Sequence, residues 1–131
     1  MKVAQGEIIS TQKVFDQSDF DTFATLSGDD NPIHVDSVFS TGTRFGQTVA
    51  HGMLLYGLLC GLLSHHYPDA VQLEQELKFP APTFTGQKMT IRAEVIEIMT
   101  ESGQARLATT ITNPAGEAVC DGQTILWWPK S

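Results

Sequence analysis

The stretch at residues 51–66 reads HGMLLYGLLCGLLSHH. Apolar side chains occur on nearly every side of the helix it would form, which is typical of a buried helix. A helix of this length spans about 24 Å. Gly57 and Gly61 lie four positions apart and therefore share one face. Because a glycine inside a helix costs about 1 kcal/mol, we expect another backbone to approach this face closely. Pro68 should end the helix.

Strand-like segments follow the helix. They are rich in Val, Ile, Thr and Trp, and they comprise residues 71–79, 88–100, 104–112 and 117–128. Residues 7–15 suit a first strand. Glu101-Ser102-Gly103 and Asn113-Pro114-Ala115-Gly116 are hairpin turn signals. One buried helix combined with antiparallel strands predicts a single α+β domain over residues 1–131, with the sheet curled around the helix.

Two shorter helices are expected ahead of the central one. Residues 17–26 carry apolar residues on one face, with Ser18 as a candidate N-cap and Asp21 three residues later. Residues 36–42 suit a second short helix.

The composition limits the partners of the chain. It has 131 residues, the size of one domain, and is 41% hydrophobic with a formal net charge of −7. Non-specific nucleic-acid binding needs a basic surface, so no nucleic-acid partner is expected. Cys60 lies in an apolar run and Cys120 in an expected strand, which argues against a disulfide framework.

Neither a signal peptide nor a membrane span is expected. The N-terminal MKVAQGEIIS has one lysine and no apolar core of signal-peptide length. The most apolar run, residues 52–63, is shorter than the roughly 20 residues that a membrane helix needs. We therefore expect a soluble, cytoplasmic protein. A small sheet would leave an edge and a flank of the helix open, which favours a homodimer.

Residues 27–36, SGDDNPIHVD, combine acids, a histidine and a proline in one loop. The proline fixes its own φ and pushes the preceding asparagine to an extended conformation, so the loop is stiff. Such a loop can hold Asp29 or Asp30 at a set distance from His34. A carboxylate and an imidazole held together can position one water molecule and transfer its proton. The spacing alone does not choose between the two aspartates.

A second cluster, Ala50-His51-Gly52-Met53, stands where the central helix begins. A helix N-terminus offers free N–H groups and partial positive charge, and glycine lets a ligand come close. A carbonyl oxygen that gains negative charge would be stabilised there, as in an oxyanion hole. The two clusters together suit chemistry on a carbon next to a thioester carbonyl.

The run FATLSGDDNPIHVD (residues 23–36), followed by FGQTVAHGMLLYGLLCGLL (residues 45–63), resembles the hydratase-2 signature of MaoC-like enzymes, the (R)-specific enoyl-CoA hydratases. LKFPAPTFTGQKMTIRAEV (residues 77–95) is similar to the strand, loop and strand after that family's central helix. The resemblance covers nearly the whole chain. A Gly-Asp-x-Asn-Pro-Ile-His core with His-Gly-Met downstream is a specific signal.

The resemblance implies a hotdog fold, in which a curved antiparallel sheet wraps a long central helix and two chains pair as a dimer. It implies reversible addition of water to a trans-2-enoyl thioester carried by CoA or acyl carrier protein, with no cofactor. Asp29 and His34 match the family's catalytic pair, and Asp30 falls on its variable position. Gly52 matches the glycine whose N–H faces the thioester oxygen.

The chain departs from the family pattern at Cys60. Some family members carry a serine there that hydrogen-bonds the catalytic aspartate, and a thiol is a weaker donor than a hydroxyl. Cys60, Asn31 and His51 are therefore candidates for supporting the catalytic pair indirectly. His51 is better suited to capping the helix and bracing the loop than to catalysis.

A metal site is the alternative for the same residues. Asp29, His34, Asp36 and His51 are of the right type, but no zinc-type spacing supports it. No metal is expected.

Two other functions are compatible with the fold. A hotdog acyl-CoA thioesterase would direct water at the carbonyl, but the Asp-x-Asn-Pro-x-His loop argues against it. A non-catalytic subunit that only binds acyl thioesters is the second. The intact Asp29 and His34 argue against that subunit, whereas the change at Cys60 leaves it open.

Overall fold

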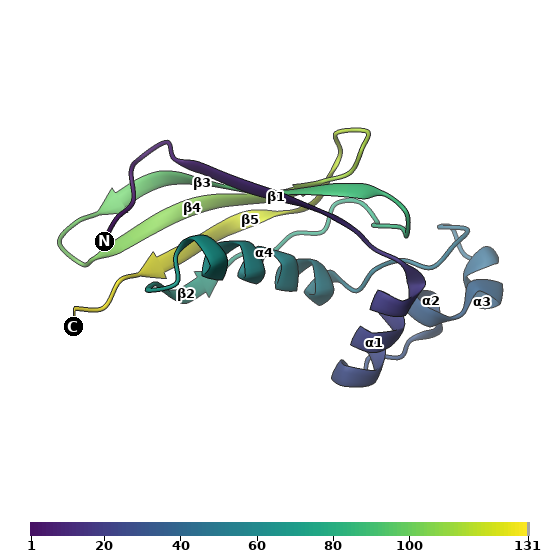
Figure 1. The fold of residues 1–131 in the computed structure, drawn as a ribbon. Coiled ribbons are helices and arrows are strands. Elements are labelled where there is room, and N and C mark those ends of the chain that lie inside the picture. The colour runs from purple at the N-terminus through teal and green to yellow at the C-terminus, as the bar shows by residue number, and fades with distance from the viewer. Residues whose placement is uncertain (131) are drawn as a thin grey trace.

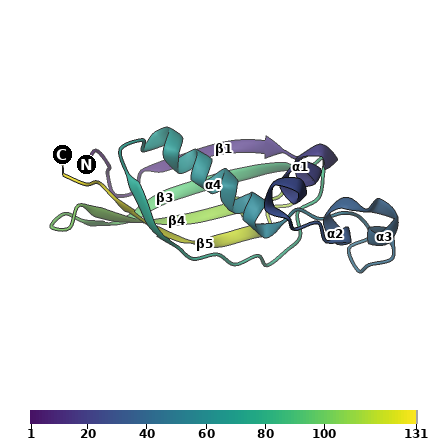
Figure 2. The same ribbon diagram turned by 90° about the horizontal axis from the view of Figure 1, so that it is seen from below.

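The computed structural model describes residues 1–130 and shows one five-stranded antiparallel sheet with a long helix, α4 (Gly52–His66), along one face (Figures 1 and 2). The strand order is β1-β3-β4-β5-β2. The strands are β1 (Ile8–Val14), β2 (Val71–Gln75), β3 (Lys88–Met99), β4 (Gln104–Thr112) and β5 (Ala118–Trp127). This is the α+β arrangement that the sequence predicts.

Helix α4 is held on the sheet by a leucine stripe. Leu55, Leu59, Leu62 and Leu63 are each at most 4% exposed and share one core with the inward side chains of β3, β4 and β5. Full burial of one leucine contributes about 1.5–3 kcal/mol, so these contacts fix the helix against the sheet. Among residues 1–130, no helix is long and apolar enough to cross a membrane.

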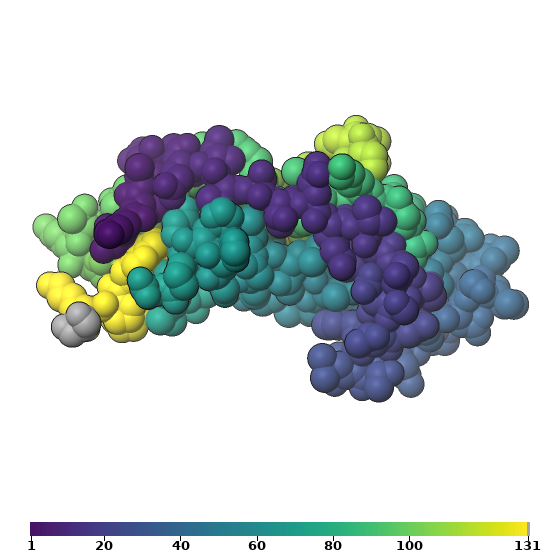
Figure 3. Space-filling view, viewed as in Figure 1, coloured from purple at the N-terminus to yellow at the C-terminus, as the bar shows by residue number. Residues whose placement is uncertain are grey.

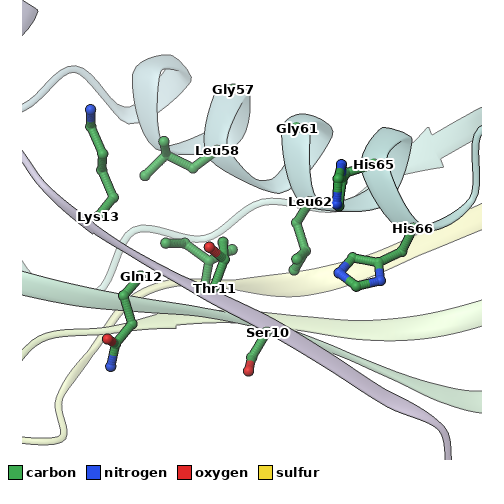
Figure 4. A pocket seen from close by; sticks show the side chains of 11 residues that line it. Ser10, Thr11, Gln12, Lys13, Gly57, Leu58, Gly61, Leu62, His65 and His66 are labelled. Atoms are coloured by element: carbon green, nitrogen blue, oxygen red, sulfur yellow. The ribbon is translucent and has the colours of Figure 1, made fainter.

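Within residues 1–130, the two glycines of α4 do not meet another backbone, contrary to the expectation from their spacing. A Cβ added to Gly57 or Gly61 would have no atom within 4 Å. Both line an open groove of about 540 Å³ between α4 and β1, which Ser10 and His66 also line (Figure 4). The leucine stripe faces the sheet, so the glycine face is turned away from the core.

Three short helices form an overhang, residues 17–41, at the end of the sheet where α4 begins (Figures 1 and 3). They are α1 (Gln17–Ser27), α2 (Pro32–Val35) and α3 (Ser37–Thr41). The predicted cap of α1 was wrong. Asp16 accepts from the Asp19 amide and Asp19 accepts from the Asp16 amide, so the capping box starts two residues before Ser18.

Strand β2 ends at Gln75, four residues earlier than predicted. The chain beyond it still follows β5, because the Glu76 amide donates to Gln123 O at 2.8 Å and Lys78 forms a bridge with Asp121. This close path is possible because residue 122 is a glycine. A Cβ at Gly122 would overlap the carbonyl oxygen of Glu76.

We expect Gly122→Ala to lower the free energy of unfolding by about 1–3 kcal/mol, the usual cost of overpacking. Gly57→Ala is the matched control, since its methyl group would meet nothing and should stabilise the helix by up to about 1 kcal/mol. Urea denaturation of both variants measures the difference. Equal stabilities would mean that the Glu76 backbone moves aside at no cost.

Candidate active site

The loop between α1 and α2 is fixed at both ends. Gly28 closes α1 with φ 81°, a left-handed conformation that favours glycine. Asn31 opens α2, because its Oδ1 accepts from the Ile33 amide at 3.1 Å and Pro32 takes the first helical position. Asn31 is therefore a helix cap for the turn that carries His34, which is how it supports the site.

The structure brings Asp29 and His34 together. Asp29 Oδ2 lies 3.8 Å from His34 Nε2, and the carboxylate is 55% exposed while the imidazole is 14% exposed. The Asp30 side chain makes no hydrogen bond or ion pair within residues 1–130, so Asp29 is the aspartate that lies beside His34. A gap of 3.8 Å is too long for a direct hydrogen bond and leaves both groups able to contact one water molecule.

The protonation pattern of His34 follows from its other contact. His34 Nδ1 lies 2.8 Å from the carbonyl oxygen of Val49. A carbonyl only accepts, so Nδ1 carries the hydrogen and Nε2 of the neutral ring presents its lone pair toward Asp29. His34 can thus accept a proton at Nε2 and return it from there.

His51, at the N-cap position of α4, contacts both residues of the Asp29–His34 pair. Its Nε2 donates to the Asp29 carbonyl at 2.8 Å, and its ring stacks on His34 with centroids 3.7 Å apart. Burial is the main factor that lowers the pKa of His51 below its ordinary value. The ring is therefore neutral near pH 7.

Gly52 is the first residue of α4, and its amide donates to no acceptor within residues 1–130. The ring of Phe79 lies where a Cβ of residue 52 would be, with two ring atoms 2.9 Å from that position. Beside Gly52 opens a pocket of about 240 Å³ that Arg44 and Thr83 also line. This free N–H at a helix N-terminus lies beside a pocket and directly after His51, which contacts both Asp29 and His34. It can stabilise negative charge on a bound carbonyl oxygen.

Comparison with known proteins agrees with this arrangement. The family model of the MaoC like domain matches residues 3–117. The chain belongs to the MaoC-like family. The 3-hydroxybutyryl-CoA dehydratase of Methylorubrum extorquens is 36% identical, with 99% of this chain and 82% of that protein covered. The (R)-specific enoyl-CoA hydratase of Aeromonas caviae is 33% identical, with 95% and 94% covered.

Solved structures confirm the hotdog fold of this MaoC-like protein. The (R)-hydratase of Aeromonas caviae superposes with a TM-score of 0.93 at 32% identity and covers 98% of each chain. The R-hydratase PhaJ1 of Pseudomonas aeruginosa gives a TM-score of 0.92 at 30% identity, with 99% of this chain and 84% of that chain covered. The family resemblance and the fold class predicted from the sequence are confirmed.

Cys60 is a predicted site residue that this MaoC-like chain does not bring to the Asp29–His34 pair. It lies eight residues after Gly52, which is about 12 Å along the helix. Its Sγ contacts Gln72 Oε1 at 3.6 Å, beside the Tyr56 hydroxyl, and has no contact with Asp29 within residues 1–130 of one chain. Support of Asp29 by residue 60 therefore stays a prediction.

Two residues that hold the loop were missed in the sequence. Gln17 donates to the carbonyl of His34 at 2.8 Å and accepts from Thr48 at 2.6 Å, which ties α1 to both halves of the site. Ser40, fully buried, donates to the carbonyl of Ile33 at 3.2 Å. A glutamine or a serine on a short helix carries no sequence signal for such contacts.

The residues considered for a metal site divide into two groups. One ligand atom each from Asp29, His34 and His51 lies within 4.8 Å of the others. Asp36 is excluded from this cluster because its carboxylate accepts from the Val38 and Phe39 amides and caps α3.

Proposed function

We propose that the protein catalyses the reversible addition of water to trans-2-enoyl thioesters, giving (R)-3-hydroxyacyl thioesters. The observation that carries this function is the Asp29–His34 pair, spaced at 3.8 Å and contacted by His51, the residue directly before the free amide of Gly52. The pair can hold a nucleophilic water, and the amide can polarise a carbonyl. The (R) configuration rests on the named activity of the Aeromonas caviae relative.

The reaction follows from these positions. A water molecule held between Asp29 and His34 attacks the β-carbon of the enoyl group and gives one proton to the pair. The C=C electron pair moves toward the thioester oxygen, where the Gly52 N–H stabilises the enolate-like charge. The pair then returns a proton to the α-carbon, so one water is added in total. Both side chains can reach the water, and the division of the proton transfers between them is left open.

One assay separates the candidate functions. A hydratase removes the absorbance of the conjugated double bond of crotonyl-CoA without releasing free thiol. A thioesterase releases thiol, and a non-catalytic binding subunit does neither. In the reverse direction, the protein should dehydrate (R)-3-hydroxybutyryl-CoA and leave the (S) isomer unchanged. Release of thiol at the rate of absorbance loss would contradict the proposal.

The substrate carrier is CoA or acyl carrier protein. The Aeromonas caviae relative is named an enoyl-CoA hydratase, whereas similar proteins of Arabidopsis thaliana and Solanum lycopersicum are named 3-hydroxyacyl-[acyl-carrier-protein] dehydratases. The reaction as written needs only the two side chains and an amide, so we propose that it requires no cofactor and no metal. A cytoplasmic location stays a prediction from the sequence.

We infer that the chain forms a homodimer through the open edge of β2. Strand β2 stands at the end of the sheet and pairs only with β5 within residues 1–130. Val71 and Leu73 on β2 are 44% and 47% exposed, next to Trp127 at 37%. An apolar cluster on a free strand edge is a surface that a second chain would cover.

We expect Leu73→Glu to convert the dimer to a monomer of 14.3 kDa in sedimentation velocity, because a buried unpaired charge is costly at an interface. Ile8→Glu is the matched control, since Ile8 is 52% exposed on the opposite edge strand β1. Dissociation by Ile8→Glu alone would place the interface at β1.

A further inference from the structure

His51 is the most deeply buried titratable side chain around the proposed site, at 2% exposed. It occupies the N-cap position of α4, where a polar side chain usually accepts from an amide of the first helical turn. Its imidazole makes no such hydrogen bond within residues 1–130. Burying a polar ring costs free energy unless its hydrogen bonds are replaced, so capping does not explain why a histidine stands here.

The contacts of His51 fix its tautomer. Nε2 lies 2.8 Å from the carbonyl oxygen of Asp29, and because a carbonyl only accepts, Nε2 carries the hydrogen. Nδ1 is buried and has no partner within residues 1–130. Protonation would place a second N–H where nothing accepts it, so the neutral form is favoured. The titratable groups that face the ring are Asp29 and His34.

The ring of His51 is held between α1 and α2. One neighbour is Phe23 of α1, at 4.7 Å between ring centroids. The other is His34, stacked at 3.7 Å with an interplanar angle of 22°. A single side chain thus contacts the backbone of Asp29 and the ring plane of His34.

We propose that His51 is a positioning residue for the Asp29–His34 pair. Its Nε2–H anchors the Asp29 carbonyl, and its ring sets the plane of the His34 imidazole. These two contacts keep the 3.8 Å gap at a width that one water molecule spans. Small displacements matter here, because a shift of about 1 Å in a reacting group can cost roughly 10²-fold in rate. The inference rests on the proposed hydratase function.

Two variants test separately the hydrogen bond of His51 to the Asp29 carbonyl and its stacking on His34. His51→Gln can keep a donor to the Asp29 carbonyl and loses the stacked ring, whereas His51→Phe keeps a ring and loses the donor. We expect each to lower kcat for crotonyl-CoA by about 10-fold with KM within about twofold of wild type, and His51→Ala to lower kcat by about 10²-fold. Each rate is divided by the fraction of protein that is folded at the assay temperature, as measured by thermal melting. A kcat within twofold of wild type in both the Gln and Phe variants would overturn the proposal.

The pH profile tests whether His51 transfers a proton itself. If it only positions the pair, the acidic limb of the kcat profile should keep its midpoint in His51→Gln, and loss of that limb would make His51 an acid–base catalyst. Wild-type activity that EDTA abolishes and zinc restores would make it a metal ligand. Either result overturns the proposal. A wild-type protein without crotonyl-CoA hydration would instead refute the proposed function.

Imidazole NMR of the wild-type protein needs no variant. Long-range proton–nitrogen correlation spectra should show His51 as the neutral Nε2–H tautomer at pH 7. A resonance from a protonated Nδ1 at that pH would contradict the inferred hydrogen bond to Asp29, and with it the positioning role.

Discussion

Asp29→Asn is expected to lower the hydration of crotonyl-CoA by at least about 10²-fold, the usual size of one acid–base contribution. An amide has nearly the shape of a carboxylate but cannot take a proton from water. The Asp29 carboxylate faces His34 Nε2 at 3.8 Å, so the change removes one of the two groups that hold the water. The carbonyl that His51 binds belongs to the backbone and is unaffected.

The neighbouring aspartate supplies the control. Asp30→Asn removes the same charge from the same loop, yet the Asp30 side chain makes no hydrogen bond or ion pair in residues 1–130, so the rate of this variant should stay near that of wild type. The side chain of Asp29 is 55% exposed, and we therefore expect both variants to melt near the wild-type temperature. The mechanism is wrong if Asp30→Asn is the damaging change, or if Asp29→Asn keeps most of its rate in a folded protein.

The central helix and the strands could be predicted because their signals are local. The apolar run at residues 51–66 allows only a buried helix, and α4 begins at Gly52 and ends at His66. The hairpin turns were found at Gly103 and Gly116, both with positive φ, as their turn sequences indicate. The length of β2 could not be predicted, since the chain after Gln75 still follows β5 through Glu76 and Lys78 but no longer forms a continuous strand.

Which residues meet at the site could be predicted only in part. The motif singles out Asp29 and His34, and their side chains lie 3.8 Å apart because both stand in one stiff loop. Their catalytic role stays a prediction. The contact from Gln17 to Thr48 joins residues 31 positions apart and depends on how α1 packs against the segment before α4. The surroundings of Cys60 and Gly57 could not be predicted for a similar reason. Helical spacing shows which residues share a face of α4, but the packing of the helix on the sheet determines which face is buried.

The stacking of His51 on His34 is a further contact of this kind. Both residues were singled out in the sequence, but 17 positions separate them and nothing local predicts a ring distance of 3.7 Å. The contact arises because the Val49 carbonyl binds His34 two residues before His51. The segment that leads into α4 therefore fixes the orientation of His34.

His34→Ala should have an effect of at least about 10²-fold on the same reaction, because it removes the lone pair that faces Asp29 and the group that shares the water. The Val49 carbonyl loses its donor as well, but the imidazole is still 14% exposed, so we expect the variant to fold. His65→Ala is the matched control, since His65 is an exposed histidine at the far end of α4. Its rate should equal that of wild type.

Chemical rescue distinguishes proton transfer by His34 from a purely structural role. Truncation to alanine leaves a space the size of the lost ring. This space is open at one side and bounded at another by the ring of His51, which stacks on His34 in the wild type. Added imidazole can enter this space and supply a nitrogen near Asp29, so the rate of His34→Ala should rise with imidazole concentration and saturate. His65→Ala and Asp29→Asn should not respond, because neither lacks that ring. The opposite result would be a folded His34→Ala variant with a low rate that imidazole does not raise and a melting temperature well below that of wild type. It would show that His34 acts by holding the loop to Val49 rather than by transferring a proton.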